Sequence, residues 1–122
     1  MKAFKPEEAL LRDVLELCQR YNIRTAHFRA GMTQAGRWVT AVQGDGKGYP
    51  DLTLAGTRVM VRELKDDGKY PTPDQRLWLA AFERAGTDVG VWRPKDWRAG
   101  LIHAQLEAIR VRPGVTSAVS GG

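Results

Sequence analysis

An aspartate and a glutamate–lysine pair stand close together in this chain, in the segments Tyr49-Pro50-Asp51 and Glu63-Leu64-Lys65. Asp51 opens one predicted strand, and Glu63 and Lys65 lie two residues apart on the next. Side chains two residues apart on a strand point to the same face of a sheet. When two such strands pair as a hairpin, a carboxylate from each meets at one place, with a lysine beside them.

These residue types indicate metal-assisted chemistry on phosphate. Two neighbouring carboxylates repel each other, and a cation relieves the repulsion. Oxygen ligands without imidazole or thiolate favour magnesium or manganese, and magnesium leaves positions for substrate phosphate. The metal lowers the pKa of a bound water and polarises a phosphoryl oxygen, while a lysine orients the attacking hydroxide or stabilises the developing charge. The group therefore predicts hydrolysis of a phosphodiester.

Local patterns predict the elements that precede the hairpin. Pro6 followed by two glutamates is typical of a helix start, and apolar residues then recur every three or four positions as far as Cys18. Strand-forming runs predict strands at residues 23–28 and 37–42. Residues 30–36 predict a loop between them, and the glycine-rich residues 43–48 predict a turn. Residues 51–55 and 58–65 then predict the hairpin.

The second half of the chain predicts a crossover. Thr72 and Gln75 have the spacing of a capping box and open a helix that ends at Gly86. A strand at residues 88–92 and a last helix at residues 94–109 follow. Because a helix separates residues 58–65 from residues 88–92, these two strands are expected to run parallel.

Together these elements predict an α/β fold. We expect three layers around a mixed sheet, in a single domain over residues 1–112, and a disordered tail at residues 113–122. Because side chains alternate along a strand, Val59 and Val61 lie on the same face as Glu63. The two valines are apolar, so we expect the rest of the protein to cover that face.

Composition excludes several other classes. Lys plus Arg number 19 and Asp plus Glu 14, a net charge of +5 that favours an anionic partner. The single cysteine, Cys18, forms no intrachain disulfide and no cysteine-rich zinc site. No apolar run reaches the roughly 20 residues of a membrane span, and the first residues lack the apolar core of a signal peptide. We therefore expect a cytoplasmic protein.

Three longer segments carry a family resemblance. The stretches GYPDLTLAG, VRELKDDGKYPTPDQRLWLAAFERAG and VGVWRPKDW resemble the VRR-NUC domain of the PD-(D/E)xK nuclease superfamily. The resemblance covers roughly residues 7–97 and is greatest to the small stand-alone VRR-NUC proteins of phages and bacteria. It implies a restriction-endonuclease-like three-layer α/β/α core with a mixed central sheet.

The resemblance also implies roles for individual residues. Asp51 and Glu63 match the metal ligands of the family, and the backbone carbonyl of Leu64 would complete the site. Lys65 matches the catalytic lysine, and Gln75 matches a glutamine beside the site. A simpler interpretation of Gln75 as a capping residue stays open, and both roles are compatible.

The family also has a glutamate on its first helix that approaches the metal. Glu7 matches it by spacing, and Glu8 is the alternative. Either residue also suits the positive end of the helix dipole, which requires no metal.

A basic segment precedes the hairpin. Residues 17–44 contain no Asp or Glu, and arginines there are suited to bidentate hydrogen bonds with DNA phosphates. Such binding reads the backbone rather than the bases and weakens steeply with salt. The candidate DNA-binding residues are Arg20, Arg24, His27, Arg29, Arg37 and Lys47.

These observations predict a Mg²⁺- or Mn²⁺-dependent endodeoxyribonuclease. The resemblance implies structure-selective cutting of branched DNA, as in Holliday-junction resolvases, and a homodimer. No Ser, Cys or Tyr is set beside a base, so we expect direct attack by water. Two alternatives stay open: a non-catalytic DNA-binding module with a nuclease-like fold, and a flap or single-strand nuclease.

Overall fold

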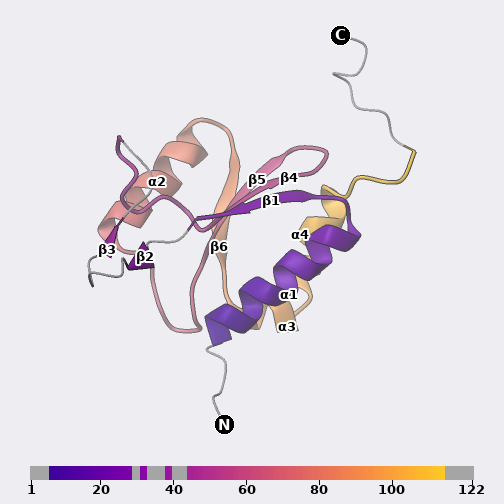
Figure 1. The fold of residues 1–122 in the computed structure, drawn as a ribbon, viewed down its shortest axis with the longest axis horizontal. Coiled ribbons are helices and arrows are strands. Elements are labelled where there is room, and N and C mark those ends of the chain that lie inside the picture. Colours follow the sequence, from indigo (N-terminus) through magenta and orange to yellow (C-terminus); the bar gives the residue numbers. More distant parts are fainter. Residues whose placement is uncertain (1–5, 29–30, 33–37, 40–43, 115–122) are drawn as a thin grey trace.

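The computed structural model describes residues 6–28, 31–32, 38–39 and 44–114 (Figure 1). The elements follow in the order α1 (Pro6–Arg20), β1 (Arg24–His27), β2 (Gly31–Met32), β3 (Trp38–Val39), β4 (Leu52–Ala55), β5 (Val59–Leu64), α2 (Pro73–Arg84), β6 (Asp88–Trp92), α3 (Pro94–Arg98) and α4 (Leu101–Ala108).

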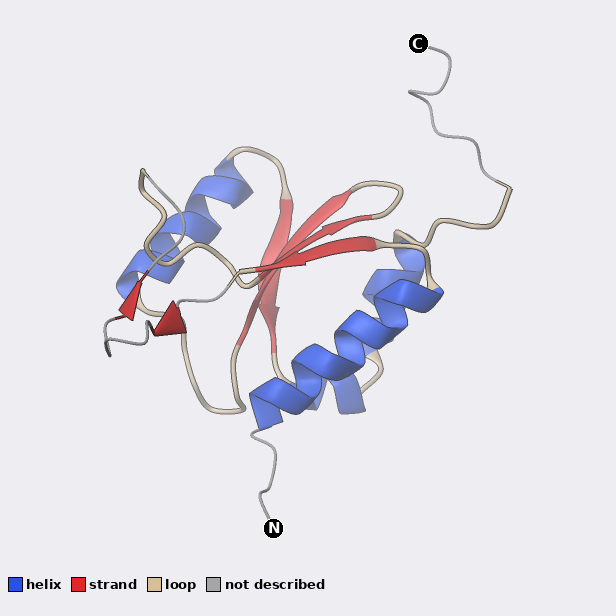
Figure 2. Cartoon of the chain, in the orientation of Figure 1, coloured by secondary structure: helices blue, strands red, loops and turns tan. Residues whose placement is uncertain are grey.

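A mixed four-stranded sheet in the order β1-β4-β5-β6 forms the centre of the fold (Figure 2). β4 pairs antiparallel with both β1 and β5, whereas β6 runs parallel to β5. The predicted hairpin and the predicted parallel crossover through α2 are therefore confirmed. β2 and β3 pair with each other as a separate two-stranded sheet.

The first helix forms where the sequence predicts it. Its core-facing side carries Leu10, Val14, Leu17 and Cys18, all buried. Asn22 then takes a positive φ of 59°, a conformation that asparagine tolerates, and its side-chain amide donates to the Val111 carbonyl oxygen at 2.9 Å. Burial raises the pKa of the Cys18 thiol to about 12, so this cysteine is not a nucleophile in the folded chain.

Alternating side chains of β5 serve the two faces of the sheet. Met60 and Leu64 join the main core, with Leu52 and Leu54 of β4 and with side chains of α1 and α4. Val61 and Glu63 point to the opposite face and are also buried. α2 packs against β6, and Figure 1 shows it on the side of the sheet away from α1.

A buried arginine ties the sheet to α4. Arg62 is only 4% exposed, and its Nη2 donates to Asp88 Oδ1 at 2.9 Å and to Gln105 Oε1 at 3.1 Å. Trp92 donates from its indole nitrogen to the same Gln105 oxygen at 2.7 Å. Burial lowers the pKa of Arg62, while the Asp88 carboxylate acts against that shift. This network satisfies a charge that would otherwise be costly to bury.

The structure differs from the sequence prediction at three places. The predicted helix over residues 94–109 is divided into α3 and α4, because Gly100 takes a left-handed conformation with φ 80°. Gly31–Met32 form β2, where a loop was expected. Val59 is 51% exposed, so the covered part of the Glu63 face begins only at Val61.

Two other predictions extend beyond the described residues. Trp38–Val39 agree with the strand predicted at residues 37–42, whose other positions are not described. The predicted tail at residues 113–122 is described only to residue 114. Within the described ranges, no helix combines the length and apolar character that crossing a bilayer requires.

Candidate active site

Asp51 and Glu63 lie side by side at the start of β4 and the end of β5. Leu52 pairs with Arg62, so continuing that antiparallel register by one residue brings Asp51 opposite Glu63. The Asp51 backbone N–H donates to Glu63 Oε1 at 3.1 Å, and the Leu64 backbone N–H donates to Asp51 Oδ2 at 2.8 Å. Each carboxylate is thus held by a backbone amide of the opposite strand.

Lys65 completes this group. Its Nζ lies 3.5 Å from Glu63 Oε2, and the Lys65 side chain is 17% exposed while that of Glu63 is 1% exposed. The Lys65 backbone N–H donates to the Trp92 carbonyl oxygen at 3.0 Å, which continues the β5–β6 pairing beyond Leu64. The structure therefore brings Asp51, Glu63 and Lys65 together.

The environment of Glu63 opposes its negative charge. Burial, followed by the charge and hydrogen bonding of Asp51, raises its pKa to about 8, while Lys65 acts in the opposite direction. These surroundings favour the protonated form of Glu63 in the metal-free protein. A divalent cation favours the ionised carboxylates, so the donor set fits magnesium or manganese. No third Asp, Glu, His or Cys in the described part of the chain completes a metal-binding cluster.

The segment before Asp51 is packed against α2. Pro50 is buried, and the Tyr49 ring makes edge contacts with Phe28, Trp78 and Phe82 at centroid distances of 5.6, 4.9 and 5.9 Å. No role was predicted for Tyr49 from the sequence. The sequence indicates that Trp78 and Phe82, four residues apart, share one face of α2, but not which segment covers that face.

Gly48 makes this close packing possible. Its φ is +82°, and a Cβ at this position would lie 2.6 Å from the Asp74 carbonyl carbon and 2.7 Å from the Gln75 nitrogen. Only glycine fits both the backbone conformation and the contact. The first turn of α2 therefore determines where the chain enters β4.

Gln75 is engaged in the helix cap. Its side-chain oxygen accepts from the Thr72 N–H at 2.8 Å, and its own N–H donates to Thr72 Oγ1 at 3.2 Å. The predicted capping box is confirmed. A role for Gln75 in catalysis stays a prediction.

Glu7 lies in the first turn of α1 and is partly exposed. Figure 1 shows α1 beginning near the end of the sheet where β5 and β6 finish. Neither Glu7 nor Glu8 forms a three-residue metal-binding cluster with Asp51 and Glu63 in the described chain. Their approach to a metal stays a prediction.

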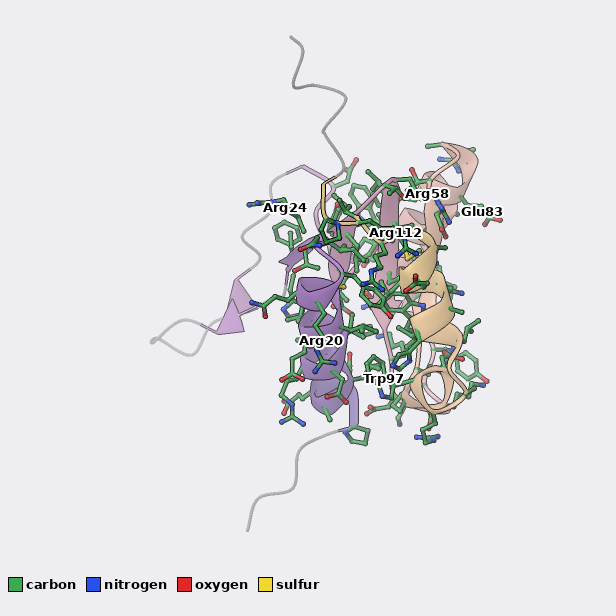
Figure 3. The ribbon with its side chains drawn as sticks, turned by 90° about the vertical axis from the view of Figure 1, so that its right-hand side faces the viewer. Arg20, Arg24, Arg58, Glu83, Trp97 and Arg112 are labelled. Carbon is green, nitrogen blue, oxygen red and sulfur yellow. The ribbon has the colours of Figure 1, made fainter. Side chains whose placement is uncertain are left out.

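The predicted DNA-binding residues are spread over the molecule. Arg20 ends α1 and Arg24 begins β1, both exposed, on the face that Figure 3 shows together with Arg112. Phe28 follows the other end of β1, and its backbone N–H donates to the Asp51 carbonyl oxygen. Arg24 is four residues from Phe28, so it lies about 13 Å along the strand from the site. These arginines are thus remote from the Asp51–Glu63 pair, and their contact with DNA stays a prediction.

The other candidates are closer to the site or outside the described residues. His27 is partly exposed and pairs in register with Leu52. Lys47 is exposed, with its Nζ 3.5 Å from Asp74 Oδ2. Arg29 and Arg37 are not among the described residues.

Comparison with known proteins adds no relative. No family model, no curated protein and no solved structure matches this chain.

Proposed function

We propose that the protein is a Mg²⁺- or Mn²⁺-dependent DNA endonuclease of the VRR-NUC type. The proposal includes a restriction-endonuclease-like three-layer core, of which the mixed sheet and the packing of α1 and α2 are the supporting features. It also includes action on branched DNA as a homodimer, because one site cuts one strand and paired cuts across a junction need two.

One observation carries the proposal. Two carboxylates from neighbouring strands are locked by reciprocal backbone hydrogen bonds, with an ammonium group 3.5 Å from the buried one. A fold has no structural need for a second acid beside a buried glutamate, since the pair is costly without a cation. A site for a divalent ion and a phosphate explains the whole group.

Asp51, Glu63 and the Leu64 carbonyl are the residues that would hold the metal. When bound there, it would supply charge stabilisation at the phosphate and a water of lowered pKa. Because burial and Asp51 favour the protonated form of Glu63, metal binding there would be accompanied by proton release.

Lys65 acts on the reacting groups themselves. Its Nζ, held against Glu63, is in place to orient the attacking water or to stabilise negative charge on the phosphate. Water attacks phosphorus directly, and no covalent bond to the protein forms. Lys65 is mostly buried, which limits its motion and strengthens its field at the phosphate.

A nuclease assay on four-way, flap and linear duplex DNA, with Mg²⁺, Mn²⁺ or EDTA, tests the proposal. We expect metal-dependent cutting that favours branched substrates. Asp51→Asn and Lys65→Ala are expected to abolish cutting while DNA binding persists. Glu83→Gln, at an exposed position on α2, is the matched control and is expected to cut normally.

The outcomes separate the alternatives. Metal-independent binding without cutting of any substrate identifies a binding module. Cutting confined to flaps or single strands identifies the other nuclease class. Normal cutting by both Asp51→Asn and Lys65→Ala contradicts the site assignment.

A further inference from the structure

The segment that joins β5 to α2 begins at Lys65 and presents an exposed aromatic ring. Tyr70 is 75% exposed, more than any other large apolar side chain in the described part of the chain. It lies five residues after Lys65 and two before the Thr72 cap. An aromatic side chain so exposed contributes little to the core, so its role is to be sought at the surface.

The ring is held in position. The guanidinium of Arg93 lies over it, with Cζ 5.3 Å from the ring centroid. Arg93 Nε and Nη2 both donate to the Lys69 carbonyl oxygen, at 3.2 and 2.6 Å. On the other side of Tyr70, Arg76 Nη1 donates to the Pro71 carbonyl oxygen at 2.8 Å. Two arginines thus fix the backbone on either side of the ring.

The rest of the segment is fastened to α3. Asp67 accepts from the Lys95 backbone N–H at 3.0 Å and from Arg98 Nη2 at 2.9 Å. Those partners lower the pKa of Asp67 and largely offset its negative charge. Lys69 and Arg76, both exposed, add positive charge on either side of Tyr70 along the chain.

Arg93 also connects the ring to the candidate active site. It follows Trp92, whose carbonyl oxygen accepts from the Lys65 backbone N–H, so the backbones of Arg93 and Lys65 are neighbours at the end of the β5–β6 pair. Because Nε and Nη2 of Arg93 bind the loop, the N–H donors of Nη1 are on the other side of the planar group. They are suited to a phosphate oxygen.

We propose that Tyr70 and Arg93 form a stacking platform for an unpaired nucleobase of the DNA strand that passes the active site. This inference rests on the proposed function and specifies its substrate. An exposed ring backed by a cation binds any base face, and the phosphate of that nucleotide meets Arg93. A base inside a duplex is already stacked and gains nothing from the platform. The platform therefore favours flaps and junctions with unpaired nucleotides over continuous duplex.

Binding measurements on the full chain in EDTA test the platform without cleavage. Fluorescence anisotropy compares a single strand, a flap and a blunt duplex of equal length. Tyr70→Ala is expected to weaken binding of the single strand and the flap by about 5- to 150-fold, the range of losing one base–aromatic stack. Tyr70→Phe keeps the ring and is expected to bind the flap and the single strand within about twofold of the wild type. Every variant is expected to bind blunt duplex within about twofold of the wild type. Leu77→Ala, which removes another highly exposed apolar side chain, is the matched control.

A second readout reports stacking directly. 2-Aminopurine placed in the flap beside the branch point is expected to lose fluorescence on binding the wild type and Tyr70→Phe, but not Tyr70→Ala. The inference is overturned if Tyr70→Ala binds the flap as tightly as the wild type, or if it loses as much affinity for blunt duplex as for the flap. It is also overturned if Leu77→Ala loses as much flap affinity as Tyr70→Ala, or if the wild type binds no DNA.

Cleavage in Mn²⁺ is scored separately. Tyr70-dependent flap binding without any cutting leaves the platform standing and removes the hydrolase. Cutting together with normal flap binding by Tyr70→Ala removes the platform and leaves the hydrolase standing.

Discussion

Glu63 is an acid at a position where an acid reduces stability. Its side chain is 1% exposed and lies beside the carboxylate of Asp51, and the mostly buried Lys65 and the backbone N–H of Asp51 offset the negative charge only in part. An amide or apolar side chain there would avoid the cost of placing a carboxylate in a poorly hydrated site. The residue is therefore better explained by chemistry than by folding.

Replacing Glu63 with glutamine tests this explanation through stability. The pKa of Glu63 is 4.5 when exposed and about 8 in the folded chain, so the native state binds more protons between these values. The free energy of unfolding should therefore fall as pH rises from about 4.5 to 8. Glu63→Gln does not titrate, so in EDTA it should equal the wild type near pH 5 and exceed it above pH 8, by on the order of a few kcal/mol.

Urea unfolding at pH 5, 7 and 9 measures the difference. Glu83→Gln, at an exposed carboxylate, is the control and should follow the wild type at every pH. A Glu63→Gln variant that is less stable than the wild type at pH 9 would show that the ionised carboxylate stabilises the metal-free fold.

At the scale of elements, the sequence was sufficient wherever one local pattern decides the structure. The strand patterns at residues 51–55 and 58–65 predicted the hairpin that pairs Asp51 with Glu63, and Thr72 with Gln75 predicted the start of α2. The break at Gly100 was missed because a single glycine inside an apolar periodic run is compatible with a continuous helix. The packing of Tyr49 on α2 was missed because contacts between distant segments depend on how the elements are arranged.

The junction between α2 and the segment before β4 can be tested at Gly48. Gly48 and Gly44 both have positive φ, +82° and +74°, but only at Gly48 would a Cβ meet α2. Gly44→Ala should lose about 1–2 kcal/mol from backbone strain alone. Gly48→Ala should lose a further 1–3 kcal/mol or so from overpacking, and cutting should fall because Asp51 shifts.

Thermal unfolding and single-turnover cleavage of both variants provide the comparison. Equal losses of stability in the two variants would mean that the chain before β4 adjusts without moving against α2. Cleavage by Gly48→Ala at the wild-type rate would mean that the position of Asp51 does not depend on this contact.

At the scale of the whole molecule, positive charge is not confined to the candidate active site. Arg20 lies at the end of α1, which is about 22 Å long, and Arg24 lies at the start of β1. Both are on the face shown in Figure 3, together with Arg112, which pairs with Glu107 at 3.1 Å. DNA that contacts these arginines and the candidate site together must extend several base pairs beyond the scissile phosphate.

This arrangement predicts a length-dependent effect of salt on binding. With long duplex arms, Arg20→Ala and Arg24→Ala together should reduce the slope of log affinity against log salt by about 2, since each phosphate contact contributes about 0.9. With arms of only about three base pairs the slope should not change, because arms of about 10 Å do not reach Arg24. Arg112→Ala is the control and should change the slope by less than about half, because Glu107 already offsets its charge. At saturating DNA, the double variant should cleave at the wild-type rate. A large fall in that rate would mean that these arginines act on the reacting phosphate rather than on the DNA beyond it.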